Sequence, residues 1–213
     1  MLGKAGVVRI EQKSFSLGQA GAAVPLRSHQ KYADDHGKSN LFLALVPKRE
    51  VALQAVETGR DIARRYGLSK SPRPHELMHV SLNGIGKYQD FPDDIVFAIS
   101  AAMATVKAAP FEVNFDRAMS FAGAKAVVLA NAIRSEEMMD LHVQLAKEMW
   151  AVGLNFTYNP RFMPHMTVFY DETPVPEHML AEPVRWIARE FVLIRSLIGK
   201  SEYEYLDRWP LVD

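Results

Sequence analysis

The stretch Leu41-Phe42-Leu43-Ala44-Leu45-Val46-Pro47 is the first part of the chain with a clear structural pattern, and it indicates the fold class. Six apolar residues in succession, ended by a proline, are typical of a β-strand that is buried on both faces. Apolar residues from Val51 to Tyr66 then recur at helical spacing, and Gly67 is a typical helix end. A second strand is expected from Met78 to Leu82, so this part of the chain has the order strand, helix, strand.

The same order returns later in the chain. Val127-Val128-Leu129-Ala130 is another short apolar strand, and Ser135-Glu136-Glu137 supplies the cap and the acidic first turn of a helix that ends near Gly153. A further strand is expected from His165 to Phe169. From Leu41 to His79 is 38 positions, and from Val127 to His165 is also 38. The sequence therefore predicts an α+β protein with two similar lobes, each containing a strand-helix-strand repeat, whose antiparallel sheets face a central cleft.

Each copy is predicted to continue with a further helix and strand. Asp93 and Asp94 precede apolar residues at helical spacing, and this helix leads to a strand near 111–115. In the second copy a shorter segment, 176–181, takes the place of that helix and leads to a β-rich run over 184–198. Residues 1–40 have no sustained apolar period and are interpreted as a loosely ordered N-terminal extension, which leaves 41–213 as one bilobal domain.

The composition narrows the classes of function. Lys and Arg number 25, as do Asp and Glu, so the chain has no general positive field for coating nucleic acid, and an RNA substrate must be met at a local site. Cysteine is absent, which excludes disulfides, thiolate nucleophiles and cysteine-bound zinc. No apolar run in the sequence approaches the length that spans a bilayer. We therefore expect a cytoplasmic monomer with no membrane partner.

Two matched triplets, His79-Val80-Ser81 and His165-Met166-Thr167, carry the candidate chemistry. Side chains two apart in a strand point to the same face, so each histidine and its hydroxyl partner are expected to face the cleft together. Histidine can take a proton from water or give one to a leaving oxygen near neutral pH, and hydroxyls can donate to phosphate oxygens. The triplets predict phosphoryl transfer, with His79 and His165 as catalytic residues and Ser81 and Thr167 as phosphate-binding residues.

These triplets resemble the two His-x-Thr/Ser-x motifs of the 2H phosphoesterase superfamily, in its branch of RNA 2′,3′-cyclic phosphodiesterases, also called 2′-5′ RNA ligases. The motifs are His79-Val80-Ser81-Leu82 and His165-Met166-Thr167-Val168 in this chain. The opening strand at 41–47 and the closing segment at 205–211 also resemble the family, so the likeness covers about residues 41–211. It implies a fold of the 2H phosphoesterase type, with His165 as the base that activates water and His79 as the acid that protonates the departing 3′-oxygen.

Two positions that border the expected cleft depart from the family pattern. Gly84 stands where many members have an aromatic residue, and Tyr170 stands where many have an arginine. We assign Tyr170 and Arg161 as candidate substrate-binding residues. Three further basic residues are alternatives for supplying the missing positive charge: Arg73, Lys87 and Lys125.

A different pattern overlaps the first triplet, because His75-Glu76-Leu77-Met78-His79 matches the His-Glu-x-x-His motif of zinc metalloproteases. In such a site two histidines one helical turn apart hold the metal. Pro72 and Pro74 lie just upstream and a strand follows, which leaves too little room for a helix through both histidines. No metal and no other cofactor is therefore expected.

The resemblance implies metal-independent hydrolysis of RNA 2′,3′-cyclic phosphate ends to a 2′-phosphate, with 2′-5′ RNA ligation as the reverse reaction. The partner is then an RNA 3′ end or a small cyclic-phosphate nucleotide. A small cyclic nucleotide, an ADP-ribose cyclic phosphate or a 2′-5′ oligoadenylate is an alternative substrate for the same site. A module that binds RNA ends with little turnover is a third alternative.

Overall fold

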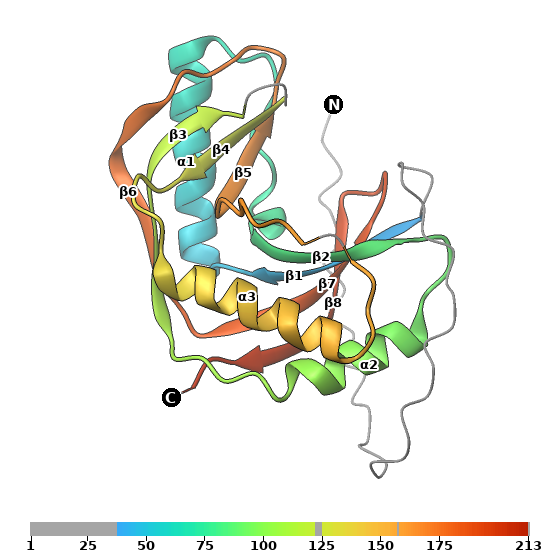
Figure 1. The fold of residues 1–213 in the computed structure, drawn as a ribbon. Helices are drawn as coiled ribbons and strands as arrows, with labels where there is room; N and C mark the ends of the chain where they lie inside the picture. Colours follow the sequence, from blue (N-terminus) through green and yellow to red (C-terminus); the bar gives the residue numbers. More distant parts are fainter. Residues whose placement is uncertain (1–37, 122–124, 157, 213) are drawn as a thin grey trace.

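The computed structural model describes residues 38–121, 125–156 and 158–212, and Figure 1 shows their fold. The predicted extension at 1–40 lies almost wholly outside the described residues, and the first strand begins at Ser39. The elements follow the order β1 (Ser39–Leu45), α1 (Arg49–Tyr66), the short 3₁₀ helix η1 (His75–Leu77), β2 (Val80–Tyr88), α2 (Asp93–Met103), β3 (Phe111–Ser120), β4 (Ala126–Ala130), α3 (Glu136–Ala151), β5 (His165–Tyr170), β6 (His178–Ala188), β7 (Glu190–Leu197) and β8 (Glu202–Pro210).

All of these strands belong to one sheet with the order β6-β3-β4-β5-β2-β1-β7-β8, and every pairing in it is antiparallel. The sheet has two halves, β6-β3-β4-β5 and β2-β1-β7-β8. The halves meet through one pair of residues, Val80 of β2 and Met166 of β5, which we call the seam. Figure 1 shows β5 and β2 running in different directions from this meeting point. The prediction of an α+β fold with two lobes is confirmed.

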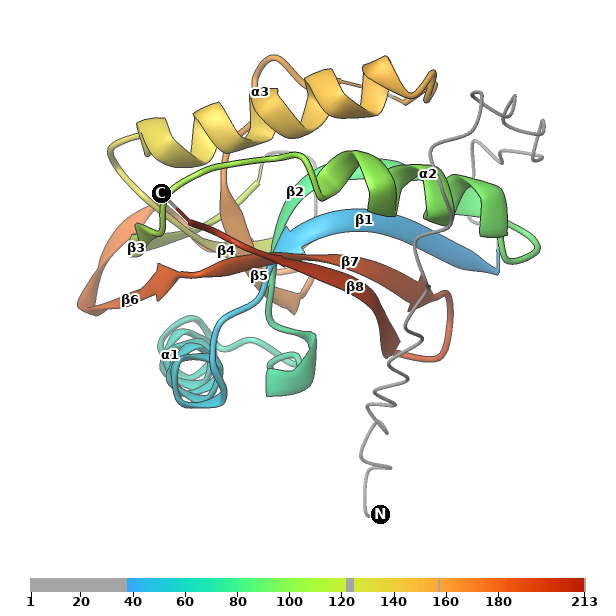
Figure 2. The same ribbon diagram turned by 90° about the horizontal axis from the view of Figure 1, so that it is seen from below.

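The strand-helix-strand repeat is present as β1-α1-β2 and β4-α3-β5, but each helix packs against strands of the other half. Helix α1 contacts β5 and β6, whereas α3 contacts β2. Figure 2 shows α1 on one side of the strands and α2 with α3 on the other. This exchange of helices ties the two halves together although the seam itself is narrow. No helix in the described part of the chain is long and apolar enough to cross a membrane.

Strand β1 is buried on both faces, as its sequence predicts. Leu41, Leu43 and Leu45 lie in the main core that the helices cover. Phe42 and Ala44 point to the opposite face, where they join a second apolar cluster. The members of this second cluster are Phe42, Ala44, Leu77, Val192, Ile194 and Tyr203. Since Leu77 precedes His79 by two residues, the cluster supports the segment that carries the first histidine.

The predicted helix ends are confirmed. Gly67 follows α1 with a φ of 65°, a left-handed conformation that glycine adopts at little cost. At the start of α3 the Ser135 hydroxyl accepts a hydrogen bond from the backbone N–H of Met138. Gly153, with a φ of 74°, follows the last turn of α3.

Two predictions about the remaining elements are wrong. Strand β2 does not stop near Leu82 but continues to Tyr88, because its pairing with β1 extends through Gly84 and Gly86. The segment 176–181 forms no helix, since His178 already begins β6 and pairs with β3. The free edge of β3 offers this segment a ladder of backbone hydrogen bonds, which local sequence does not reveal.

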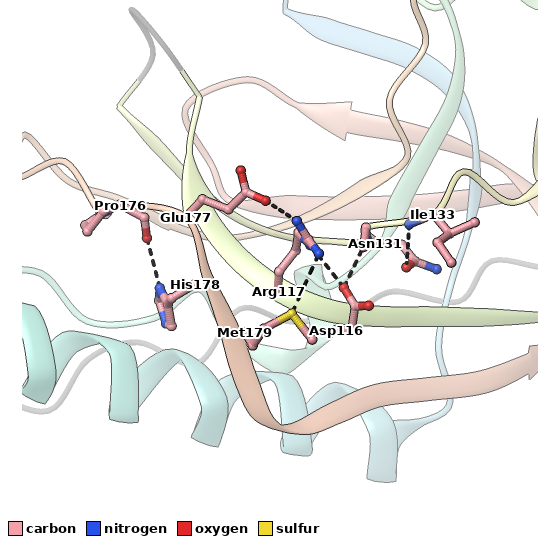
Figure 3. Close-up of polar contacts among 9 residues, drawn as sticks. Asp116, Arg117, Asn131, Ile133, Pro176, Glu177, His178 and Met179 are labelled. Carbon is pink, nitrogen blue, oxygen red and sulfur yellow. Dashed lines mark hydrogen bonds and ion pairs between the residues drawn. The ribbon is translucent and has the colours of Figure 1, made fainter.

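Side chains as well as backbone link β3 to the start of β6. Figure 3 shows Arg117 of β3 between the carboxylates of Asp116 and Glu177, with Met179 Sδ 3.7 Å from its Nη2. The same view shows the ring of His178 turned back to the carbonyl of Pro176. Arg117 is thus a guanidinium whose charge two carboxylates balance.

The loop from α1 to η1 is fixed to the end of β5 by one buried carboxylate. Asp171 accepts hydrogen bonds from the backbone N–H groups of Ser69, Lys70 and Thr173 at 2.9–3.2 Å, and from the Ser69 hydroxyl at 3.1 Å. The bonds from Thr173, Lys70 and Ser69 lower the pKa of Asp171 to about 2. The ionised carboxylate therefore orders a loop that passes close to the second histidine triplet.

Replacing Asp171 by Asn should lower the free energy of unfolding at neutral pH, because the amide cannot accept all of these bonds. A group whose folded pKa is depressed stabilises the fold above its unfolded pKa, and this contribution is lost as the pH falls through its folded pKa. The difference between wild type and Asp171→Asn should thus be constant above pH 5 and shrink between about pH 4 and 2. Denaturant unfolding across this range measures it, with exposed Asp140→Asn as the control. A difference that does not change with pH would contradict the role given to the ionised carboxylate.

Candidate active site

The seam brings the two histidine triplets together. Val80 and Met166, the central residues of the triplets, form the pair that joins β2 to β5. Both are buried, while the histidines and hydroxyl residues on either side of them are only partly buried. Because neighbouring residues of a strand point to opposite faces, His79, Ser81, His165 and Thr167 share the face that Val80 and Met166 turn away from. The four predicted residues therefore converge at one place.

The ring of His79 is fixed on both of its nitrogens. Nδ1 lies 2.9 Å from the Leu77 carbonyl oxygen, which can only accept, so Nδ1 carries the proton and donates. Nε2 then has a lone pair and accepts a hydrogen bond from the Ser81 hydroxyl at 3.1 Å. The ring packs against Phe42 and Tyr203, with centroid separations of 5.1 and 5.4 Å. The lone pair of Nε2 is thus turned toward Ser81, on the shared face.

His165 repeats this arrangement with one difference. Its Nδ1 donates to the Met163 carbonyl at 2.8 Å, and its ring meets the ring of Phe121 edge-on at 4.7 Å. Among residues 38–121, 125–156 and 158–212, no hydrogen-bond partner is found for Nε2 of His165. The second imidazole therefore presents a free lone pair, whereas that of the first is in contact with a hydroxyl.

Both imidazoles are neutral at pH 7. The pKa of His79 is lowered to about 4, chiefly by burial; the hydrogen bond to Leu77 opposes this shift, and the nearby Arg73 and His165 add to it. Burial likewise lowers the pKa of His165, against the bond to Met163. A neutral imidazole with its proton on Nδ1 is a base at Nε2. The site thus holds two bases, and one of them becomes an acid only if a bound anion stabilises its protonated form.

The two hydroxyl residues are not equivalent. The Ser81 hydroxyl is in contact with His79, so it must turn away before it can donate to a ligand. No hydrogen bond to the Thr167 hydroxyl is found in the described part of the chain, which leaves this group available to a ligand. Both remain predicted phosphate-binding residues.

Of the two candidate substrate-binding residues, only Tyr170 is linked to a histidine within the described residues. The link runs through Arg73 and Tyr203 to His79. The Tyr170 side chain is half exposed, and its hydroxyl accepts a hydrogen bond from Arg73 Nη1 at 3.2 Å. Arg161 lies in the loop before β5, exposed, beside a hollow of about 310 Å³ at the start of α3. No contact of its side chain with either histidine is found among the described residues. Of the other cations considered, Lys125 pairs with Glu172 at 2.5 Å.

The zinc-protease geometry is not formed. The 3₁₀ helix η1 has three residues and ends at Leu77, and Met78 is extended, so His75 and His79 do not lie one turn apart on a helix. The Nδ1 atom of His75 lies 3.1 Å from a carboxylate oxygen of Glu76. Within the described ranges no group of three or more His, Cys, Asp or Glu side chains is placed to hold a metal ion.

Two further histidines in the described part of the chain, His142 and His178, have structural roles. His142 is buried, and its two ring nitrogens lie 3.0 and 3.3 Å from the carbonyl oxygens of Leu82 and Asn159. His178 makes the same kind of Nδ1 bond as the catalytic candidates, to the Pro176 carbonyl at 2.9 Å, and lies 3.2 Å from the Tyr66 hydroxyl. His178 stands on β6, at the opposite edge of its half of the sheet from β5. It is therefore a useful internal control for the pair at the seam.

Sequence reasoning missed the aromatic side chains around the site. Phe42, Tyr203 and Phe121 each contact one of the two histidine rings. The alternation in Glu202-Tyr203-Glu204-Tyr205 indicates that both tyrosines share a face of β8, but not that this face adjoins His79. Their placement depends on the pairing of β8 with β7 and of β7 with β1.

At pH 7 we expect ¹⁵N NMR spectra of both seam histidines to show the neutral Nδ1–H form, because each Nδ1–H is held by a carbonyl. His79 should titrate near pH 4, and His165 below the ordinary value of 6.5. Assignment by His79→Ala and His165→Ala identifies the signals. A proton on Nε2 at neutral pH, or titration of His79 above 6.5, would contradict the described environment.

Comparisons with known proteins agree with the fold and with the family resemblance. No curated protein matches the sequence. Among solved structures, Escherichia coli LigT complexed with 3′-AMP has a TM-score of 0.70 at 20% identity, over 82% of this chain and 99% of LigT. TT0787 of Thermus thermophilus has a TM-score of 0.62 at 22% identity, over 81% of this chain and 97% of that protein. These similarities confirm the fold. The profile of the 2′-5′ RNA ligase superfamily matches residues 47–198, a span that includes both histidine motifs, and the chain belongs to this superfamily of 2H phosphoesterases.

Proposed function

We propose that this protein hydrolyses 2′,3′-cyclic phosphate ends of RNA to a 2′-phosphate, without a metal ion, by acid-base catalysis from His79 and His165. One observation carries the proposal: two imidazoles stand on the same face of the seam, each with its Nδ1 bonded to a backbone carbonyl, so that Nε2 is the nitrogen left for proton transfer. Opening a cyclic phosphodiester requires a proton to leave the attacking water and another to reach the departing sugar oxygen. Two histidines on either side of one phosphate can perform both transfers.

The environments of the two rings support the division of roles that the family resemblance implies. Nε2 of His165 has no described protein partner, so a water molecule can approach it, as a base requires. His79 is surrounded by Phe42, Tyr203 and Ser81, and is the less accessible to solvent water. We assign His165 as the base for water and His79 as the acid for the 3′-oxygen.

An acid with a pKa of about 4 is mostly deprotonated at neutral pH, so the ligand must change this value. A phosphate within about 4–6 Å favours the protonated imidazole and raises its pKa. The substrate itself thereby prepares His79 to act as the acid. In this proposal the site becomes active when the anion enters, with Thr167 and then Ser81 donating to the phosphate oxygens.

The class of ligand is a nucleotide that ends in a phosphate. LigT, which shares the fold, forms complexes with 3′-AMP, NADP⁺, ATP and phosphate. For this chain we propose RNA ends as the preferred substrate, with 2′-5′ ligation as the reverse reaction. Small cyclic-phosphate nucleotides and 2′-5′ oligoadenylates are the substrates to compare with it.

We expect purified protein to convert an oligoribonucleotide with a 2′,3′-cyclic phosphate end to the 2′-phosphate product. His79→Ala and His165→Ala should each lower the rate about 10²- to 10⁴-fold, since each removes one proton transfer. His178→Ala should leave the rate unchanged, because that histidine has the same Nδ1 bond outside the seam. Chromatography and ³¹P NMR of the product distinguish the 2′- from the 3′-phosphate.

Three outcomes would contradict the proposal. Binding of the RNA end with no turnover would leave a module that recognises RNA ends. Loss of activity in EDTA with rescue by zinc would favour a metal site, and Glu76→Gln would then abolish the activity. Faster turnover of small cyclic nucleotides than of any oligonucleotide would move the assignment to the second substrate class.

A further inference from the structure

Arg73 is fixed close to both histidine motifs by the backbone of its own loop. Its N–H donates to the carbonyl of Val168, the residue after Thr167, at 2.8 Å. Earlier in the loop, Ser69 and Lys70 are held by Asp171. The loop that carries Arg73 is therefore anchored to β5 and to Asp171 just after it, which makes the start of the Arg73 side chain a defined position beside the second motif.

The guanidinium is held between two tyrosine hydroxyls from different halves of the sheet. Nη1 donates to Tyr170 of β5 at 3.2 Å, and Nη2 donates to Tyr203 of β8 at 2.9 Å. The Arg73 Cζ also lies over the ring of Tyr170, 5.4 Å from its centroid. Tyr203 is in turn the neighbour of His79, with its hydroxyl oxygen 3.5 Å from Nδ1. The cation thus stands between the strands that carry or support the two histidines.

Within the described residues, no carboxylate balances the charge of Arg73. Throughout residues 38–121, 125–156 and 158–212, no Asp or Glu lies within ion-pair distance of its guanidinium, in contrast to Arg117, whose two carboxylates appear in Figure 3. Burial raises the pKa of Tyr203, so this hydroxyl is neutral at pH 7 and supplies no negative charge. A partly buried cation held only by neutral groups is costly unless an anion joins it.

The guanidinium also has donors to spare. Its five N–H groups form a planar fork, and the two hydroxyls account for two of them. The remaining N–H groups can donate to two oxygens of a phosphate in the bidentate manner typical of arginine. The position of Arg73, its charge and its unused N–H donors all favour a phosphate as the ligand.

We infer that Arg73 binds the non-bridging oxygens of the substrate phosphate, with Tyr170 and Tyr203 as positioning residues that hold the guanidinium in place. This inference rests on the proposed function, since the phosphate it describes is the one that His79 and His165 act on. Tyr170 then contributes by orienting Arg73 rather than by contacting the phosphate. In this chain the cation that binds the phosphate comes from the loop before the His79 motif. It does not come from strand β5, which carries the His165 motif.

The first test is anion binding, which needs no turnover. Inorganic phosphate, titrated into the protein, should shift the ring signals of His79 and His165 in ¹⁵N NMR spectra. Arg73→Gln should weaken this binding about 10- to 100-fold, the range expected for charged hydrogen bonds. Arg64→Gln, on the exposed side of α1, should not change it. Equal phosphate affinity in wild type and Arg73→Gln would overturn the inference, whatever the enzyme activity.

The second test moves the positive charge from the loop at Arg73 to strand β5, by combining Arg73→Gln with Tyr170→Arg. Arg73→Gln should lower kcat/KM for the cyclic phosphate about 10- to 100-fold, and Arg73→Lys should lower it less, because it keeps the charge without the fork. Arg73→Gln/Tyr170→Arg should have a kcat/KM above that of Arg73→Gln and close to the wild-type value, whereas Arg73→Gln/Tyr170→Phe should stay at or below the Arg73→Gln value. The phenylalanine double variant is the control for loss of the tyrosine itself.

Failure of this inference and failure of the proposed function give different results. If the wild type turns over the cyclic phosphate and the kcat/KM of Arg73→Gln is within twofold of the wild-type value, the role of Arg73 is refuted while the proposed function stands. A wild type without turnover on any cyclic phosphate would refute the proposed function, while the phosphate titration still decides whether Arg73 binds the anion. Thermal unfolding of each variant shows whether it is folded.

Discussion

One backbone pairing, Val80 with Met166, brings the two copies of the strand-helix-strand repeat into register. Every pairing within the two halves is longer, yet this single contact decides which side chains meet. Because both members of the pair are the central residues of a His-x-Ser/Thr triplet, four polar side chains come to one face at the point where the halves join. The exchanged helices, α1 against β5 and β6 and α3 against β2, keep the halves from separating there.

Burial and the charge of Arg73 determine the protonation states of the two histidines at the seam. The two imidazoles are neutral because burial disfavours their charged forms, and the guanidinium of Arg73 adds to this effect at His79. Among the described residues, the site therefore combines the unbalanced positive charge of Arg73 with two proton acceptors, His79 and His165. An entering phosphodiester would balance the charge and raise the pKa of both imidazoles, so that binding and proton transfer are coupled in the proposed mechanism.

Much of this arrangement could be predicted from local sequence. The apolar strands, the helix caps and the equal spacing of the two histidines depend on residues close together in the chain, so the repeat and the pair His79 and His165 were visible as patterns. The exchange of helices between halves was not, because it depends on packing between distant elements. The extension of β2 through Gly84 and the strand at His178 were missed for the same reason, since in both cases a partner strand supplies the hydrogen bonds.

At the site, too, contacts between residues far apart in the sequence could not be predicted. Arg73 could be identified as one of four basic residues that could supply the missing positive charge, but its contacts with Tyr170 and Tyr203 lie 97 and 130 positions away in the sequence. No periodicity of the chain encodes such contacts. Tyr203 became a neighbour of His79 only through the order of β2, β1, β7 and β8 in the sheet.

The central claim is that one seam histidine serves as the acid for the leaving oxygen and the other as the base for water. The most direct measurement compares His79→Ala and His165→Ala on a 2′-deoxyribonucleoside phosphodiester whose leaving group is 4-nitrophenolate instead of the sugar oxygen, so that water is the nucleophile. A good leaving group needs little help from an acid but still needs a base. The account predicts that His79→Ala regains most of its lost rate on this substrate, whereas His165→Ala does not. The reverse pattern, or equal defects in both variants on both substrates, would contradict it.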